Sequence, residues 1–150
     1  MVEKMPKVVG EIMSSPVVTA KPQASVREVL ELMEGKYIGA VIIVSEDGRP
    51  VGILTERDII RLFLVKGDKI LNSPVSEVMS KPLVTCSPKT PIAEALRVMH
   101  TNNIRRLPVV DGDKLVGIVT QRDITYWTLT LIGYQALRIS ELKEAEENLE

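Results

Sequence analysis

Hydrophobic and polar positions along the chain follow helix-like and strand-like patterns in a fixed order. Residues 26–33 place apolar side chains at i, i+3, i+4 and i+7, the spacing of one helix face. Residues 40–44 form a continuous apolar run, which is typical of a strand buried on both faces. Residues 51–54 predict a second strand and residues 58–65 an apolar helix. The pattern therefore predicts helix, strand, strand and helix in this part of the chain.

Turn and capping residues mark where these elements begin and end. A short segment with helical tendency at residues 8–13 and an extended segment at residues 16–19 come first. Ser25 followed by Glu28 has the spacing of a capping box, so the first long helix is expected to start there. Gly35 is expected to end that helix.

The same order of elements occurs twice. The second copy is displaced by 66 residues (Met13 to Met79) before the hairpin turns at residues 46–48 and 111–112, and is one residue shorter there. Its first helix is predicted to begin with Thr90 as the cap and Pro91 at the first helical position. Internal duplication predicts four regions: repeat 1 at 8–65, a connector at 66–74, repeat 2 at 75–130 and a C-terminal helical tail at 131–150.

Each repeat closes on a Thr-x-Arg-Asp motif, within residues 52–58 and 117–123. In both copies an apolar strand runs into the first turn of a helix. A helix N-terminus carries free N–H groups that suit anions such as phosphate, and an Asp there can accept hydrogen bonds from ribose hydroxyls. Thr as N-cap with Asp three residues later is equally a structural helix start. Duplication copies a cap as faithfully as a ligand site, so both interpretations stay open.

The combined unit resembles a tandem pair of CBS domains, a family named after cystathionine β-synthase. The resemblance covers residues 8–130 and rests on the opening at 78–85, the stretch at 105–111 and the two closing motifs. Repeat 1 departs from it at 38–42, which lacks the Arg pair and the Pro. The resemblance implies an α/β fold of the α+β type: duplicated β-α-β-β-α units packed sheet to sheet about a pseudo-twofold axis.

The family resemblance also implies a function. It implies a non-catalytic energy or metabolite sensor that binds AMP, ADP, ATP or S-adenosylmethionine in two clefts, without a catalytic cofactor or a metal. Each cleft combines the closing motif of one repeat with the opening and second-strand start of the other. Cleft one would comprise Thr55, Arg57, Asp58, Met79, Val84, Ile104, Arg105 and Arg106. Cleft two would comprise Thr120, Arg122, Asp123, Met13, Val18, Ile38 and Gly39.

The chemistry of the residues separates the two clefts. Guanidinium groups are the preferred partners of phosphate, and cleft one holds Arg105 and Arg106. Cleft two has Gly39 and Ala40 at the corresponding positions. We therefore expect cleft one to be the tighter and more salt-sensitive nucleotide site. The alternative is that the two arginines are surface charges or contacts in a dimer.

Composition limits the partners and the compartment. The chain is 45% hydrophobic but only 3% aromatic, so the core must be aliphatic. A net charge of −1 gives no general electrostatic reason to bind nucleic acid. The single cysteine, Cys86, fits a reducing compartment. With no apolar signal core and no run long enough to span a membrane, a cytoplasmic protein is expected.

Catalytic alternatives find little support in the sequence. His100 is the only histidine, so a His-based metal cluster or a Ser-His-Asp triad has no second-site support. Cys86 has no His or Cys neighbours and is expected to be a structural thiol. No P-loop occurs. Asp58 and Asp123 lie beside arginines in helix first turns, which favour the ionised carboxylate over a general acid. The chain is predicted not to be an enzyme.

The C-terminal tail bears on partners. Most of the aromatic residues of the chain lie near its C-terminal end: Tyr126, Trp127 and Tyr134. These side chains either pack on their own repeat or face a second subunit. Residues 141–150 are acidic and predict a solvated, partly frayed helix. The resemblance implies a homodimer, a disc of four repeats, acting alone or on a separate effector protein. A second hypothesis is a structural or docking protein with vestigial clefts.

Overall fold

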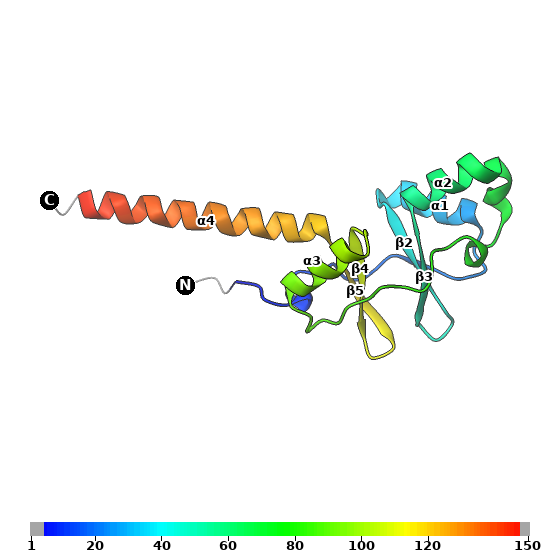
Figure 1. The fold of residues 1–150 in the computed structure, drawn as a ribbon, viewed down its shortest axis with the longest axis horizontal. Coiled ribbons are helices and arrows are strands. Elements are labelled where there is room, and N and C mark those ends of the chain that lie inside the picture. The colour runs from blue at the N-terminus through cyan, green and yellow to red at the C-terminus, as the bar shows by residue number, and fades with distance from the viewer. Residues whose placement is uncertain (1–4, 148–150) are drawn as a thin grey trace.

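The computed structural model describes residues 5–147 and divides them into two halves (Figure 1). Repeat 1 contains η1 (Val9–Glu11), β1 (Thr19–Ala20), α1 (Val26–Lys36), β2 (Ala40–Val44), β3 (Pro50–Thr55) and α2 (Glu56–Lys66). A 3-10 segment, η2 (Gly67–Asn72), connects the halves. Repeat 2 contains η3 (Val75–Glu77), α3 (Ile92–Thr101), β4 (Arg106–Asp111), β5 (Lys114–Thr120) and α4 (Gln121–Glu147).

Each half is built on a small sheet with a hairpin at its centre. In repeat 1, β1 pairs in parallel with β2, and β2 pairs antiparallel with β3 in the order β1-β2-β3. In repeat 2, β4 and β5 form an antiparallel pair. The predicted extended segment at 16–19 pairs only from Thr19 onward. In repeat 2 the counterpart of β1 is reduced to a single parallel bridge from Cys86 to Val109.

Helix starts were predicted better than helix ends. Ser25 caps α1 as expected: its Oγ accepts from Glu28 N at 3.1 Å, while Glu28 Oε2 accepts from Ser25 N at 2.9 Å. The predicted end at Gly35 is wrong, because Tyr37 adopts the left-handed conformation (φ 54°) and closes the helix after Lys36.

The predicted start of α3 is wrong by one residue. Pro91 lies at the N-cap instead of the first helical position, so the capping position has no side chain that can accept a hydrogen bond. The hydroxyl of Thr90 instead accepts from Ser87 N at 3.0 Å, within the preceding turn.

The two hydrophobic cores are interlocked. The leading segment of repeat 1 supplies Val9 and Ile12 to the core of repeat 2, beside Met99, Leu107 and Val119. In the same way Val75, which opens repeat 2, is buried in the core of repeat 1. Backbone hydrogen bonds fix both segments in place: Val9 N donates to Thr90 O at 2.9 Å, and Val75 N donates to Ala24 O at 2.7 Å. Neither repeat can therefore complete its core without the opening segment of the other.

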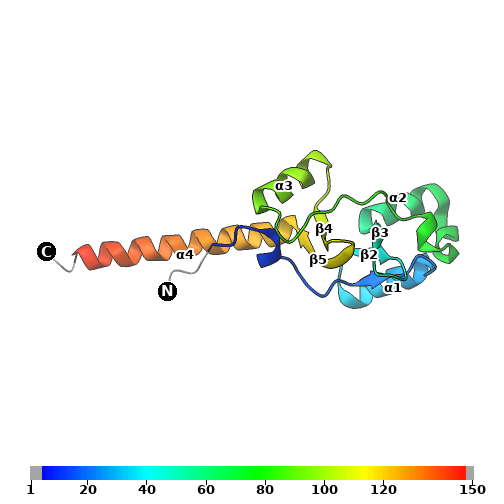
Figure 2. The same cartoon turned by 90° about the horizontal axis from the view of Figure 1, so that it is seen from below.

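The last helix projects from the body of the molecule. Figures 1 and 2 show α4 leaving repeat 2 and extending well beyond both halves. Its first turns pack on the core of repeat 2 through Ile124 and Trp127, but Leu129, Leu137 and Leu142 are each more than half exposed. The predicted boundary between repeat 2 and the tail, at residue 130, falls inside this continuous helix. Residues 148–150 of the predicted tail lie outside the described residues.

Candidate ligand clefts between the repeats

The closing motif of repeat 1 forms a capping box in which one carboxylate oxygen does the capping. Thr55 is the N-cap of α2, and its Oγ1 accepts from Asp58 N at 3.2 Å. Asp58 Oδ2 accepts from Thr55 N at 3.0 Å and from Thr55 Oγ1 at 2.9 Å. The other oxygen, Oδ1, accepts from the hydroxyl of Ser80 in repeat 2 at 3.3 Å. Capping therefore leaves Oδ1 turned toward the other repeat, where it can meet a ligand hydroxyl.

The closing motif of repeat 2 has the same cap. Thr120 N donates to Asp123 Oδ2 at 2.9 Å, and Asp123 N donates to Thr120 Oγ1 at 3.0 Å. Ser14 is the counterpart of Ser80, but among the described residues it makes no hydrogen bond to Asp123. The two closing motifs are therefore alike in their caps and different in what faces the second carboxylate oxygen of the Asp.

Backbone pairing brings each opening segment onto the closing strand of the other repeat. Ser80 N donates to Ile53 O at 2.8 Å, and Ile53 N donates to Ser80 O at 3.2 Å. The pseudo-symmetric pair joins Ser14 N to Ile118 O at 2.9 Å and Ile118 N to Ser14 O at 3.1 Å. The structure thus places the opening of repeat 2 beside Asp58 and the opening of repeat 1 beside Asp123.

Two glycines make this close approach possible. A Cβ at Gly52 would lie 2.3 Å from Met79 Sδ, and a Cβ at Gly117 would lie 2.5 Å from Met13 Sδ. Neither glycine has a positive φ, so the requirement here is space and not backbone conformation. In both places, therefore, the methionine of one repeat lies over the first glycine of the other repeat's closing motif.

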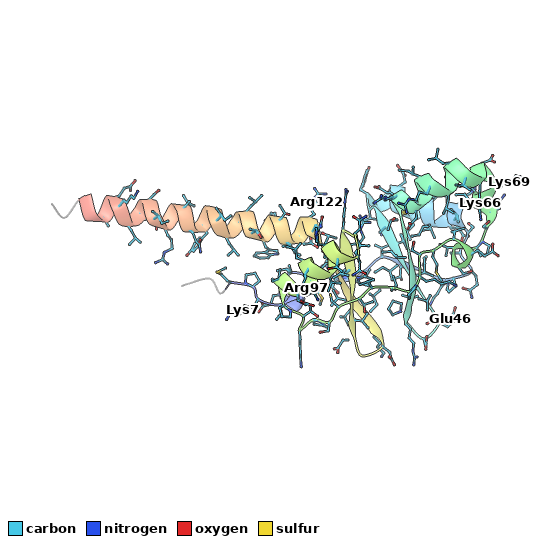
Figure 3. The ribbon with its side chains drawn as sticks, in the orientation of Figure 1. Lys7, Glu46, Lys66, Lys69, Arg97 and Arg122 are labelled. Atoms are coloured by element: carbon cyan, nitrogen blue, oxygen red, sulfur yellow. The ribbon has the colours of Figure 1, made fainter. Side chains whose placement is uncertain are left out.

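Arg105 and Arg106 have different surroundings. Arg105 is exposed, whereas Arg106 is partly buried at the start of β4. Burial lowers the pKa of the Arg106 guanidinium. The negative charges of Glu56 and Asp58 act in the opposite direction and raise it. Arg106 is therefore the cation that the fold directs toward the first turn of α2. Lys66 and Lys69 lie at the far end of repeat 1 from the start of α4, where Figure 3 labels Arg122.

Gly39 lies beside charged groups of cleft one. The sequence assigns it to cleft two, yet a Cβ at Gly39 would lie 3.4 Å from Glu56 Oε2 and 3.5 Å from Arg106 Nη1. Its carbonyl accepts from Glu56 N at 3.0 Å. Gly39 is therefore also a neighbour of the charged groups of cleft one.

The remaining predicted residues fall into two groups. The apolar ones pack against the cores: Val84, Ile104 and Met13 on repeat 2, and Val18, Ile38 and Met79 on repeat 1. The two motif arginines, Arg57 and Arg122, are exposed. Sequence reasoning missed two residues, Ser80 and Glu56. Ser80 follows Met79 in the opening motif and Glu56 follows Thr55 in the closing motif, so their positions within the motifs were the available signal.

Other reactive groups lie outside these clefts. Cys86 is half-buried, and burial raises the pKa of its thiol from an ordinary value of 9.0 to about 11. His100 is exposed in the last turn of α3. Across residues 5–147, no group of three or more His, Cys, Asp or Glu side chains is placed to hold a metal ion, and none of the helices is long and apolar enough to cross a membrane.

Comparison with known proteins identifies the family. Residues 9–65 and 75–129 each match the CBS domain, so the chain belongs to the CBS domain family and carries two copies. Protein MK0525 of Methanopyrus kandleri is 36% identical over 143 residues, which span 94% of this chain and 71% of that protein. The chain spans only 30% to 40% of the length of three further relatives, from Thermofilum pendens and Methanocaldococcus jannaschii.

Solved structures share the fold. The CBS-domain protein ATU1752 from Agrobacterium tumefaciens superposes with a TM-score of 0.79 at 27% identity, covering 85% of this chain and 98% of that one. The CBS domain pair of MJ0100, in complex with 5′-methylthioadenosine and S-adenosylmethionine, has a TM-score of 0.74 at 30% identity, covering 85% and 97%. CBSX2 in complex with AMP has a TM-score of 0.75 at 25% identity, covering 84% and 98%. The fold is that of a CBS domain pair.

Proposed function

We propose that this chain is a non-catalytic regulatory module that binds an adenosyl ligand between its two repeats. The observation that carries the proposal is the second carboxylate oxygen of Asp58, Oδ1, which takes no part in the cap and accepts from the Ser80 hydroxyl of the other repeat, while Arg106 lies nearby. At this helix N-terminus, a carboxylate oxygen can accept hydrogen bonds from ribose hydroxyls and a guanidinium can bind the phosphate joined to that ribose. Related CBS pairs solved with AMP or with S-adenosylmethionine support the same class of ligand.

In cleft one, different residues would bind different parts of the ligand. Asp58 Oδ1 would accept from the ribose hydroxyls in place of the hydroxyl of Ser80, while Thr55 continues to cap the helix. Arg106 would meet the phosphate. Exposed Arg105 would add long-range attraction, which salt screens. Val84, Ile104 and Met79 would contact the adenine.

Cleft two would hold the same nucleoside with less charge. Asp123 offers the equivalent carboxylate oxygen, and Met13, Val18 and Ile38 offer the apolar surface. Ala40 stands at the position corresponding to Arg106, so the counterpart of that guanidinium is missing. We expect cleft one to bind AMP, ADP or ATP more tightly, and its affinity to fall more steeply with ionic strength.

Regulation would act through the relation between the repeats. Each cleft would be made from both repeats, so a ligand would contact two bodies that also share their cores. A ligand that binds one arrangement of the repeats better than another shifts the population toward it. The signal would reach a separate effector protein or a second copy of the chain.

We also propose that the chain forms a homodimer. On α2, Ile60 is 61% exposed and Leu64 and Val65 are each 82% exposed. Large apolar side chains gathered on one helix are typical of a surface that contacts another subunit. Size-exclusion chromatography with light scattering checks the mass, and a monomer at micromolar concentration would contradict this part of the proposal.

A structural protein with vestigial clefts is the second candidate. It is favoured by the capping boxes, because capping alone gives Asp58 and Asp123 a role in the ligand-free fold. Such a protein would keep both Asp residues for stability and bind no adenosyl compound.

Thermal unfolding separates the two candidates. A ligand present at about 100 times its dissociation constant stabilises a protein by roughly 2.7 kcal/mol. For a chain of this size that corresponds to a rise in Tm of about 5–10 °C. We expect such a rise with AMP, ADP, ATP or S-adenosylmethionine. No shift with any of them, over millimolar ranges, would favour the structural protein.

A further inference from the structure

The closing motifs of the two repeats differ at the residue after Thr, and the difference is a charge. Repeat 1 has Glu56 and repeat 2 has Gln121 at the first position of the helix. Their backbones are equivalent: Glu56 N donates to Gly39 O at 3.0 Å, and Gln121 N donates to Arg105 O at 2.9 Å. The two side chains therefore stand at matching places in the two clefts, one anionic and one neutral.

Glu56 lies close to the cation that would bind phosphate. A Cβ at Gly39 would lie 3.4 Å from Glu56 Oε2 and 3.5 Å from Arg106 Nη1, which places the two charged atoms no more than about 7 Å apart. Gly39 has no side chain to separate them. The charges of Glu56 and Asp58 both act on the partly buried guanidinium of Arg106.

We infer that Glu56 is a specificity-determining residue that limits how much negative charge cleft one accepts. It competes with the ligand phosphates for Arg106 and repels any phosphate that Arg106 does not neutralise. Cleft one therefore prefers a monophosphate to a triphosphate, and tolerates a cationic adenosyl compound such as S-adenosylmethionine. This inference rests on the proposed function of the same cleft.

A purely structural role for Glu56 makes a different prediction. An acidic residue in the first turn stabilises its helix through the helix dipole. On that account, Glu56→Gln lowers the Tm of the unliganded protein and changes the affinity for all adenosyl ligands by the same factor. On our account, the change in affinity depends on the charge of the ligand.

The expected size follows from Coulomb's law. The upper limit of the separation between Glu56 and Arg106 is about 7 Å. For two unit charges at that separation, removing one changes an affinity about 3-fold at the dielectric constant of water and about 50-fold at an effective value near 20. Glu56 is exposed, so the lower part of this range applies. Removing the charge should raise AMP affinity about 3- to 10-fold and ATP affinity by a larger factor, and leave adenosine within about 2-fold.

The experiment is calorimetric titration of adenosine, AMP, ATP and S-adenosylmethionine into the full chain at low salt. Asp123→Asn is used as the background in all proteins, so that the signal reports on cleft one. Glu56→Gln is compared with Glu144→Gln, a change of the same charge on the exposed far part of α4. Adenosine binding also shows that Glu56→Gln is folded at the site.

The inference is supported if the gain in affinity rises in the order adenosine, AMP, ATP, shrinks in high salt, and becomes a loss for S-adenosylmethionine. Equal changes for adenosine, AMP and ATP, or no change, would overturn it while leaving the proposed function intact. Failure of every adenosyl compound to bind either the background protein or Glu56→Gln would overturn both. Glu144→Gln should leave all four affinities unchanged.

Discussion

Replacing Gly52 by Ala tests how the two repeats are held together at the clefts. The new Cβ would lie 2.3 Å from Met79 Sδ and 2.7 Å from Met79 Cγ, distances that real Cβ atoms essentially never show. The side chain of Met79 must therefore move. Met79 directly precedes Ser80, which pairs with Ile53 through its backbone and donates its hydroxyl to Asp58, so we expect the shift to reach these contacts.

The magnitude follows from two opposing terms. Overpacking of this kind costs about 1–3 kcal/mol. Replacing Gly by Ala in a strand returns about 0.5–1 kcal/mol, because the unfolded chain loses freedom. Because Met79 Sδ and Cγ would both lie under 3.0 Å from the new Cβ, the upper part of the overpacking range applies, and we expect Gly52→Ala to lower the free energy of unfolding by about 1–2 kcal/mol. In a Met79→Ala background the clash is gone and the cost should vanish, which gives a coupling energy of about 1–2 kcal/mol.

Urea unfolding followed by circular dichroism measures these free energies. Gly35→Ala is the matched control, because a Cβ there meets nothing within 4 Å and helix α1 should gain stability. Gly117→Ala should be harder to rescue by Met13→Ala, because its Cβ would also lie 3.1 Å from the carbonyl oxygen of Ser14. A Gly52→Ala protein within about 0.5 kcal/mol of wild type, or a cost that persists without Met79, would refute the reasoning.

Three further predictions concern the ligand, the thiol and the dimer. Arg106→Ala should weaken AMP binding at least about 10-fold and more than Arg105→Ala does, because only Arg106 is partly buried beside Asp58; equal effects in calorimetry would contradict the assignment. Burial raises the pKa of Cys86 to about 11, so its alkylation at pH 8 should be slow, which iodoacetamide labelling followed by mass spectrometry checks. The contribution of Cys86 to stability should be lost as pH rises from about 9 through 11, which melting curves recorded across that pH range check. Leu64→Glu combined with Val65→Glu should convert the dimer to a monomer in light scattering, and that monomer should keep the circular dichroism spectrum of the fold, since both side chains are 82% exposed on the single chain.

Local signals in the sequence located the helices and strands well. Ser25 with Glu28, and the apolar run at 40–44, predicted α1 and β2 because capping and hydrophobic pattern act over a few residues. The ends were harder. Gly35 was expected to end α1, but Tyr37 adopts the left-handed conformation that ends it. At the start of α3, Pro91 occupies the N-cap position that was expected for Thr90. These choices depend on how the following segment packs, which local sequence does not encode.

The sequence alone could not show how the repeats contact each other. The exchange of Val9 and Val75 between cores is a contact between distant segments, so no local pattern reveals it. Gly39 was assigned to one cleft and lies near the guanidinium of Arg106 of the other, because the Arg106 side chain reaches across from β4 of repeat 2. The difference between Arg105 and Arg106 likewise comes from burial in the assembled fold.

Binding of an adenosyl ligand at the two closing motifs is the central claim, and calorimetric titration of AMP tests it most directly. Wild type, Asp58→Asn, Asp123→Asn and the double variant form the series, with Asp111→Asn on the exposed hairpin as the control. We predict binding by wild type, loss of the tighter phase in Asp58→Asn, retention of that phase in Asp123→Asn, and loss of all binding in the double variant. Binding by the double variant with wild-type affinity, or no binding of AMP, ATP or S-adenosylmethionine by wild type, would contradict the account.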